Sequence, residues 1–254
     1  MRVMTWNCRG RLGHKKELLQ HVAPDIAVVQ ECSREDSRLL DRGAQFFWQS
    51  KQIDPAAPKG LGILSFNPSI VMHPLPLPDQ WSSLTKSDPG RMDVIVPVEV
   101  LAPVRLNVLA VWSYNNRHRG SRKRKLRGPI LCALDFLGDW LSNAPSLVMG
   151  DFNNEPSYDE SPSSKNLFSE HLNTLEKLEM KSLYHESSRE PHGAESTNSH
   201  FWAGRKYFHI DYIFASEQVR KASKFSIMSF EDMKALGVKS DHVPLWVDYP
   251  DAVS

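Results

Sequence analysis

Residues 147–153 read LVMGDFN, three apolar residues followed by a glycine and by polar residues at positions 151 and 153. The apolar run predicts a short buried strand over Leu147–Met149. Gly150 begins a tight turn, which places Asp151 and Asn153 at the end of that strand. Because a strand end belongs to a rigid sheet, it can hold a carboxylate and an amide at fixed positions around one ion or one phosphate. An Asx-turn is the purely structural alternative for the same residues.

Five further short motifs stand at or beside strand-like apolar runs. They are Trp6-Asn7, Gln30-Glu31, Gly60-Leu61-Gly62, His209-Ile210-Asp211-Tyr212 and Ser240-Asp241-His242. Packing alone does not account for several buried-looking strands that each end in Asn, Asp, Glu or His. The pattern therefore indicates an enzyme.

The composition is that of an ordinary globular protein. The chain has 254 residues, 41% hydrophobic and 24% charged, without repeats or a low-complexity tail, and we interpret residues 1–254 as one domain. The net charge of +1 excludes a polycation, so any attraction to nucleic acid must come from a local patch. No apolar run approaches the length of a membrane span, and no signal core follows the N-terminus, so we expect a cytoplasmic monomer.

The three cysteines provide no disulfide framework. Cys8 and Cys32 directly follow the Asn7 and Glu31 motifs, which would place them on neighbouring strands. Reduced core thiols are favoured over a redox pair.

Hydrophobic periodicity predicts a strand-rich chain with few helices. The predicted helices are His14–Val22, a short one with Ser33 or Asp36 as its cap, Pro129–Leu141 and Leu167–Leu178. Loops are predicted over His73–Pro89 and Glu186–Asn198. The predicted strands are Arg2–Asn7, Asp25–Glu31, Phe46–Trp48, Leu61–Phe66, Val94–Val100, Leu106–Val111, Leu147–Met149, Tyr207–Phe214, Phe225–Met228 and Val243–Val247. Strand runs in both halves, each with a helix or two, fit a two-sheet core with helices on its outer faces.

With all six motifs in this order, the chain resembles the endonuclease/exonuclease/phosphatase superfamily, which includes deoxyribonuclease I, AP endonucleases, deadenylases and inositol phosphatases. The resemblance runs from Arg2 to Val247. It implies an α/β (α+β) fold, a four-layer sandwich of two packed, mainly antiparallel β-sheets flanked by helices. It also implies a metal-dependent hydrolase acting on phosphate ester bonds.

The resemblance further implies a Mg²⁺ site, with Mn²⁺ as the alternative ion. Glu31 is the expected ligand, because Mg²⁺ prefers oxygen ligands and takes one or two protein carboxylates. Asn7 would orient the ion or its water shell, and Asp241 would lie close to the metal. Taken alone, Asn7 fits equally well as an amide that caps the backbone at a strand end.

The remaining catalytic roles also follow from the resemblance. Asp151 would orient or deprotonate the attacking water, while Asn153 would donate a hydrogen bond to the scissile phosphate. Asp211 would hold His242, which contacts a phosphate oxygen. These roles suit phosphoryl chemistry, which needs an aligned nucleophile and charge stabilisation. A carboxylate partner raises the pKa of a histidine, so His242 would stay charged near neutral pH.

One position departs from the family pattern. After the strand Leu106–Val111, the family usually has a Tyr or His that touches the phosphate, and here that position is Trp112. An indole N–H can donate a hydrogen bond but cannot transfer a proton. Tyr114 is a nearby substitute, and Asn115 is a candidate phosphate contact.

A basic segment, residues 117–127, follows these positions and contains no acid. The alternative is a solvated run of surface charges, but such runs normally contain both signs. The segment therefore favours binding of nucleic acid, with DNA preferred over RNA. Its cations are Arg117, Arg119, Arg122, Lys123, Arg124, Lys125 and Arg127.

Aromatic residues suggest a further substrate contact. Phe201, Trp202 and Phe208 line up with positions that form the abasic-sugar pocket of AP endonucleases, and Asp88-Pro89-Gly90-Arg91 is similar to a glycine-arginine element of that branch. The Gly150–Pro156 segment, GDFNNEP, lacks the alanine-histidine usual there, and core packing is the alternative for the aromatic residues.

The sequence thus predicts a Mg²⁺-dependent phosphodiesterase, a DNA endonuclease or exonuclease. Two alternatives stay open: a phosphatase or small-molecule phosphodiesterase of the same fold, and a non-catalytic nucleic-acid-binding relative.

Overall fold

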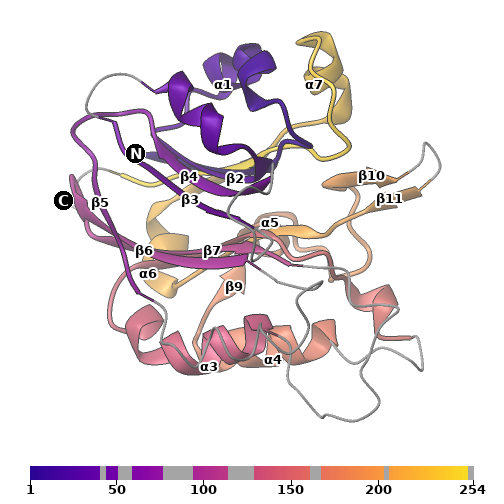
Figure 1. Ribbon diagram of the computed structural model, residues 1–254. Helices are drawn as coiled ribbons and strands as arrows, with labels where there is room; N and C mark the ends of the chain where they lie inside the picture. The colour runs from indigo at the N-terminus through magenta and orange to yellow at the C-terminus, as the bar shows by residue number, and fades with distance from the viewer. Residues whose placement is uncertain are drawn as a thin grey trace.

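The computed structural model describes residues 1–40, 44–50, 59–76, 94–113, 129–160, 167–202 and 206–250. Two six-stranded sheets lie face to face, with helices on both outer faces (Figure 1). Helices α1 (Lys16–Val22) and α7 (Phe230–Ala235) cover the first sheet. Helices α3 (Pro129–Ser142) and α4 (Phe168–Lys177) cover the second. The four-layer sandwich expected from the sequence is confirmed.

The first sheet contains both the first strand of the chain, β1, and the last, β14. β1 and β2 are its parallel pair, with Val3 opposite Ile26 and Asn7 opposite Gln30, and α1 forms the crossover between them. The strands in spatial order are β13 (Lys224–Ile227), β14 (Leu245–Asp248), β1 (Arg2–Asn7), β2 (Ile26–Cys32), β4 (Gly60–Ser65) and β3 (Phe46–Ser50).

The second sheet repeats this plan. β7 and β8 are parallel, with Asn107 opposite Ser146 and Trp112 opposite Asp151, and α3 lies in the crossover. The strands in spatial order are β5 (Val71–Pro74), β6 (Val94–Ala102), β7 (Leu106–Trp112), β8 (Ser146–Asp151), β12 (Asp211–Ala215) and β9 (Lys181–Ser182).

The parallel pairs decide where polar side chains gather. Parallel strands end at the same edge of a sheet, so β1 and β2 bring Asn7 and Glu31 to one edge. For the same reason β7 and β8 bring Trp112 and Asp151 to one edge. The two edges face each other, because the Asn7 side chain reaches across to Asp151. Four strands from two sheets therefore end at one place.

Three apolar layers hold the sandwich together. Val3, Val108 and Met149 belong to the layer between the sheets. Met4 and Trp6, on the opposite face of β1, belong to the layer under α1. A third layer lies between the second sheet and the helices α3 and α4. Central strands are thus buried on both faces, which is why their sequences are apolar without strict alternation.

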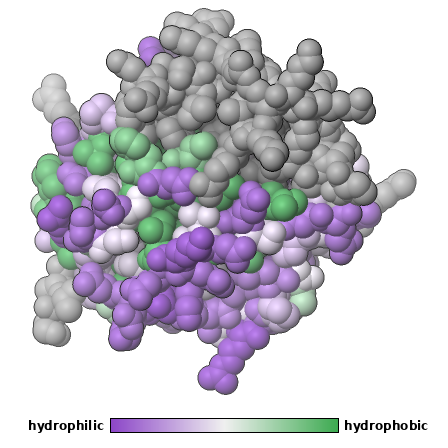
Figure 2. All heavy atoms as spheres, turned by 90° about the horizontal axis from the view of Figure 1, so that it is seen from below, coloured by the Kyte–Doolittle hydropathy of each residue, from purple (hydrophilic) through white to green (hydrophobic). Residues whose placement is uncertain are grey.

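The outer surface over α3 and α4 is mostly hydrophilic, with smaller hydrophobic areas (Figure 2). Among the described helices, none is long and apolar enough to cross a membrane. Cys8 and Cys32 are buried and not joined to each other, and burial raises the pKa of Cys8 to about 12. Both are core thiols.

The predicted strand Tyr207–Phe214 is wrong as a single element. It divides into β11 (Lys206–Phe208), which pairs with β10 (His200–Trp202), and β12 of the second sheet. The chain changes sheets between them, where Ile210 and Asp211 donate their N–H groups to the Ser199 hydroxyl.

Two predicted loops contain regular structure. The loop Glu186–Asn198 begins inside α5 (Leu183–Ser188), whose Leu183 and Tyr184 are buried. The loop His73–Pro89 begins inside β5, where the Gln45 side chain bonds both backbone groups of Met72. Residues 77–89 lie outside the described residues.

The remaining elements are short. The helix expected after Ser33 is confirmed as a 3-10 turn, in which the Asp36 carboxylate accepts from the Ser33 N–H and hydroxyl. α6 (Glu217–Ala222) and α7 were not predicted, since six residues show too little periodicity. The 3-10 turns are Leu12–His14, Arg34–Leu39 and Pro156–Tyr158.

Candidate active site

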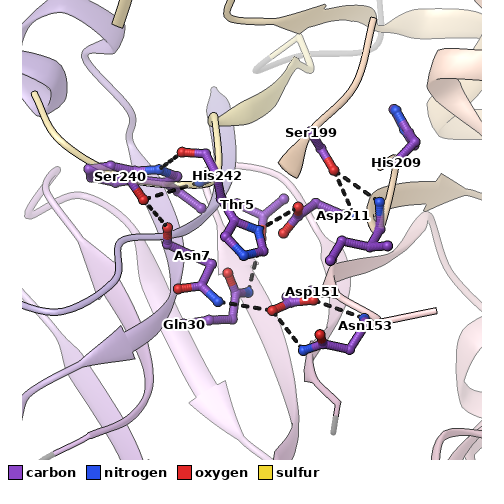
Figure 3. Close-up of polar contacts among 12 residues, drawn as sticks. Thr5, Asn7, Gln30, Asp151, Asn153, Ser199, His209, Asp211, Ser240 and His242 are labelled. Atoms are coloured by element: carbon purple, nitrogen blue, oxygen red, sulfur yellow. Dashed lines mark hydrogen bonds and ion pairs between the residues drawn. The ribbon is translucent and has the colours of Figure 1, made fainter. Parts of the chain in front are cut away.

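A hydrogen bond between Asn7 and Asp151 joins the two sheets at their shared edge (Figure 3). The Asn7 Nδ2 donates to Asp151 Oδ2 at 2.9 Å and to Glu31 Oε1 at 3.4 Å. Asn7 and Asp151 are both buried. One amide therefore sets the positions of two carboxylates from different sheets.

The Asp151 carboxylate is held on both oxygens. Oδ1 accepts from the Asn153 backbone N–H at 2.8 Å, and Oδ2 accepts from Asn153 Nδ2 at 3.1 Å. Asn153 has φ +48°, a left-handed conformation that asparagine tolerates well. Its Nδ2 also donates to the Ser113 carbonyl at 3.0 Å. The turn after β8 thus fixes the carboxylate in one orientation.

Gly150 is required for this turn. Its φ is +144°, and a Cβ there would lie 1.9 Å from the Val111 carbonyl oxygen. The missing side chain lets β8 approach β7 closely. Gln30 occupies the space alongside and donates to Thr5 Oγ1 at 3.0 Å and to the Val111 carbonyl at 3.2 Å. Gln30 therefore connects the two sheets beneath Asp151.

Glu31 projects from a β-bulge. The pairing register of β2 with β4 shifts between Gln30 and Cys32, and Glu31 has φ +61°. A bulge re-aims the side chain that it carries. The Lys59 Nζ lies 2.5 Å from Glu31 Oε2. Burial opposes ionisation of Glu31, but the hydrogen bond and charge of Lys59 outweigh it, so the pKa of Glu31 lies below its ordinary value.

Asp211 and His242 form a buried pair beside this group. His242 Nδ1 lies 2.8 Å from Asp211 Oδ2. Burial alone would lower the pKa of His242, but the charge and hydrogen bond of Asp211, with the charges of Asp151 and Asp241, raise it to about 9. His242 is thus a cation at neutral pH.

The backbone around the pair is also fixed. The Trp6 indole donates to the His242 carbonyl at 2.9 Å, and the Ser240 hydroxyl donates to the Asn7 carbonyl at 3.0 Å. Asp241 lies 3.4 Å from Arg9 Nη1. These contacts tie the segment before β14 to the end of β1.

The donor atoms around Glu31 suit a divalent cation. Around Glu31, the available atoms are carboxylate and amide oxygens, which Mg²⁺ prefers, and the Lys59 ammonium already marks a cation position there. Asp151, Asp211 and His242 also bring one ligand-type atom each within 4.8 Å of the others, but a protonated His242 has no lone pair to offer an ion. Asp211 Oδ1 is buried and accepts no hydrogen bond from the described residues. An acceptor left unpaired in this way fits a cation or water.

The aromatic residues lie on the β10–β11 hairpin next to His242. The hairpin is attached there by the Phe201 N–H, which donates to the Asp241 carbonyl at 2.7 Å, and by the bridge between His200 and His242. Trp202 is 60% exposed, whereas Phe201 and Phe208 are half-buried. The hairpin projects from the sandwich (Figure 1), so Trp202 is not a core residue.

The other predicted substrate contacts are either buried from solvent or lie outside the described residues. Trp112 is 5% exposed and packs in the layer between the sheets. The positions outside the described residues are Asp88, Pro89, Gly90, Arg91, Tyr114, Asn115, Arg117, Arg119, Arg122, Lys123, Arg124, Lys125 and Arg127.

Sequence reasoning missed several residues that shape the site. Lys59 and Ser113 stand next to recognised motifs, so their proximity was a usable signal. Ser199 had no such signal, although its hydroxyl accepts the Asp211 N–H at 2.9 Å. Arg9 was also overlooked, whereas Gln30 belongs to the recognised Gln30-Glu31 motif and only its contact with Val111 was missed.

Comparisons with known proteins agree with the fold. The model of the Endonuclease/Exonuclease/phosphatase family matches residues 4–242. No curated protein sequence matches the chain significantly.

Solved structures share the fold over nearly the whole chain. The 3′ phosphatase NExo from Neisseria, bound to a product DNA hairpin, is 21% identical with a TM-score of 0.69, covering 98% of this chain and 99% of that one. An AP endonuclease from Leishmania major is 15% identical with a TM-score of 0.66, covering 98% and 88%. An AP endonuclease from Archaeoglobus fulgidus is 14% identical with a TM-score of 0.62, covering 98% and 99%.

Proposed function

Since this chain belongs to the Endonuclease/Exonuclease/phosphatase family, we propose that it is a Mg²⁺-dependent phosphodiesterase that hydrolyses nucleic acid, with DNA as the preferred substrate. The observation that supports this most is that polar side chains from the two sheets meet at one shared edge. The Asn7–Asp151 bond brings Glu31 beside Asp151, and the Asp211–His242 pair lies against the same carboxylate.

In this proposal Glu31 holds the metal, with Asn7 and Asp241 nearby and Mn²⁺ as the alternative ion. The bound ion supplies positive charge that polarises the phosphate oxygens. Lys59 would leave Glu31 when the ion binds, because its ammonium lies against the same carboxylate oxygen.

Asp151 orients the attacking water and accepts its proton. Its carboxylate is buried and fixed by Asn7 and Asn153, so little reorganisation is needed when substrate binds. The Asn153 Nδ2 donates to Ser113 and Asp151, and a hydrogen bond to the phosphate would replace one of these.

His242 stabilises charge on the phosphate. Asp211 occupies Nδ1, which leaves Nε2 to donate to a phosphate oxygen. A buried cation in a low-dielectric site stabilises developing negative charge more strongly than an exposed one.

Nucleic acid would lie along the same edge. Exposed Trp202 offers a face on which a base can stack, and the basic segment 117–127 would contact the phosphate backbone. A monomeric state and a cytoplasmic location are further parts of the proposal. The choice between endonucleolytic and exonucleolytic cutting, and any preference for abasic sites, are decided by the substrate panel below.

A substrate panel tests the proposal. Purified protein is incubated with Mg²⁺ or EDTA and with supercoiled plasmid, linear duplex, single strand, abasic duplex, RNA or p-nitrophenyl phosphate. We expect metal-dependent cutting of DNA, and a loss of about 10²–10⁴-fold in Asp151→Ala, the range for a general base. Asp248→Ala is the matched control, because it removes a carboxylate paired with Arg2 at the opposite end of β1.

Two outcomes would overturn the proposal. Activity confined to the small phosphate ester would assign the chain to the phosphatases of this fold. Binding of duplex without hydrolysis of any substrate would make it a non-catalytic relative.

A further inference from the structure

A second group of metal-ligating side chains lies outside the proposed active site. One ligand atom from each of His185, His192 and Glu195 lies within 4.8 Å of the other two. His185 is on α5, and the other two are on the segment between α5 and β10. None of the three donates to or accepts from an active-site side chain among the described hydrogen bonds.

The three residues lie close together and are half-buried. His185 Nε2 lies 3.0 Å from Glu195 Oε1, and these side chains are 9% and 4% exposed. The rings of His185 and His192 are stacked, with centroids 3.5 Å apart and planes at 26°. The buried Nδ1 of His192 has no hydrogen-bond partner within the described ranges. A buried imidazole nitrogen without a partner needs an explanation, and a bound ion is one of the usual ones.

The surrounding contacts fix His185 and Glu195, and the stacked His192 ring would turn away from His185 for both imidazoles to face one ion. The Ser182 hydroxyl lies 2.7 Å from His185 Nδ1, so that ring presents Nε2 toward Glu195. The Gly193 N–H donates to Glu195 Oε1 at 3.0 Å. Gly193 has φ +88°, and this left-handed turn lets His192 and Glu195 lie on the same side of the segment. Hydrogen bonds to the far side of metal ligands are typical of metal sites.

The donor chemistry selects the kind of ion. Two imidazoles and one carboxylate suit Zn²⁺ and related transition metals, whereas Mg²⁺ prefers oxygen atoms only. A cavity of about 280 Å³ lined in part by His185, His192 and Met180 gives an ion a path to the group. We propose that His185, His192 and Glu195 bind a divalent transition-metal ion of the Zn²⁺ class, at a structural site separate from the active site.

A bound ion would stabilise the segment between α5 and β10, which contacts the active site. The segment that carries His192 and Glu195 continues to Ser199, whose hydroxyl accepts the backbone N–H of Asp211. Asp211 in turn holds His242. The three ligands are thus positioning residues at most for the hydrolysis, and the direct expectation is higher thermal stability with metal bound.

A Zn²⁺ titration of the full chain tests this inference. The protein is stripped with EDTA and dialysed, and Zn²⁺ binding is measured by competition with a chromogenic chelator, together with Tm. The variants are His192→Ala and Glu195→Gln. His21→Ala is the matched control, because His21 is exposed on α1. Asp151→Ala disrupts the Asp151, Asp211 and His242 group, the other cluster of ligand-type atoms among the described residues, and so keeps the two groups distinguishable.

We expect wild type and His21→Ala to bind at least one equivalent of Zn²⁺, Asp151→Ala to keep one equivalent, and all three proteins to gain Tm from it. His192→Ala and Glu195→Gln should lose at least about 10–100-fold in affinity, since even changes to residues behind the ligands have effects of that size. Ser182→Ala, which keeps all three ligands, should lose about 10-fold. It serves as the test if a ligand variant fails to fold.

Co²⁺ provides an independent readout, because its visible spectrum should change between wild type and His192→Ala. The inference is overturned if wild type binds no stoichiometric Zn²⁺, or if Ser182→Ala and both ligand variants keep wild-type affinity. It is also overturned if Asp151→Ala alone abolishes binding. Loss of hydrolysis with Zn²⁺ binding intact would count against the proposed function and leave this site standing.

Discussion

Replacing Asp211 with asparagine should lower the pKa of His242 and destabilise the protein in a pH-dependent way. The variant keeps the shape of the side chain but removes the negative charge 2.8 Å from His242 Nδ1. Burial then acts on His242 with less opposition, so its pKa falls from about 9 toward or below its ordinary value of 6.5.

The magnitude follows from these two pKa values. At pH 7.5 the ratio of charged to neutral His242 is about 30 to 1 in the folded protein, whereas it is about 1 to 10 in the unfolded chain. The difference stabilises the fold by about 2 kcal/mol at this pH. Because the folded pKa is the higher one, this stabilisation is complete below pH 6.5 and is lost as the pH rises through 9.

Urea unfolding at about pH 6, 7.5 and 9.5 measures the effect, and NMR of the imidazole rings follows the titration of His242 directly. The stability difference between wild type and Asp211→Asn should shrink as the pH rises. Asp248→Asn makes the same chemical change in the ion pair with Arg2 and should leave the pKa of His242 unchanged. A difference that is constant from pH 6 to 9.5, or a wild-type His242 that titrates below pH 7, would show that Asp211 does not keep His242 charged.

Three further changes probe other parts of the molecule. Gly150→Ala should lower the free energy of unfolding by at least about 3 kcal/mol, because the new Cβ would collide with the Val111 carbonyl and alanine is strained at the φ of this position. A variant as stable as wild type would contradict the close approach of β8 to β7. The buried His171 has its pKa lowered to about 4 by burial, so it stabilises the fold above pH 6.5 and this is lost as the pH falls toward 4. The loss of unfolding free energy between pH 7.5 and pH 4.5, measured by urea unfolding, should therefore be smaller in His171→Leu than in wild type, by up to about 3 kcal/mol. An unchanged loss would exclude His171 as the source of the acid destabilisation. Trp202→Ala should weaken single-stranded DNA binding by about 1–3 kcal/mol in fluorescence anisotropy with Tm unchanged, and unaltered affinity would argue against stacking on this ring.

The strands that carry the site were predictable because they are buried on both faces. β1 covers the predicted range Arg2–Asn7, and α3 extends the predicted helix Pro129–Leu141 by one residue. Continuous apolar runs and a clear helical repeat arise from the two inner layers of a sandwich. The fold class therefore followed from local patterns together with the resemblance.

The hairpin near His242 was not predictable in the same way. Tyr207 and Phe214 lie in one apolar stretch, but its two halves pair with different partners, β10 and β8. The periodicity of apolar residues predicts which residues are buried, but it does not predict which neighbouring strand they pair with. The break depends on Ser199, whose hydroxyl replaces a sheet partner for Ile210 and Asp211.

The neighbours within the candidate site also depend on tertiary structure. Asn7 and Asp151 are 144 positions apart in the chain, and only the packing of the two sheets brings them together. The bulge at Glu31 and the Lys59 contact are equally invisible to a pattern of apolar residues. The roles assigned to these side chains stay predictions until they are measured.

The most direct test of the account is the rate of plasmid nicking as a function of Mg²⁺ concentration, in wild type and in Glu31→Gln. The account predicts saturable activation by Mg²⁺ in wild type, no nicking in EDTA, and loss of the activation in Glu31→Gln. Nicking in EDTA, or an unchanged Mg²⁺ dependence in the variant, would contradict the central claim that a metal held by Glu31 takes part in phosphodiester hydrolysis.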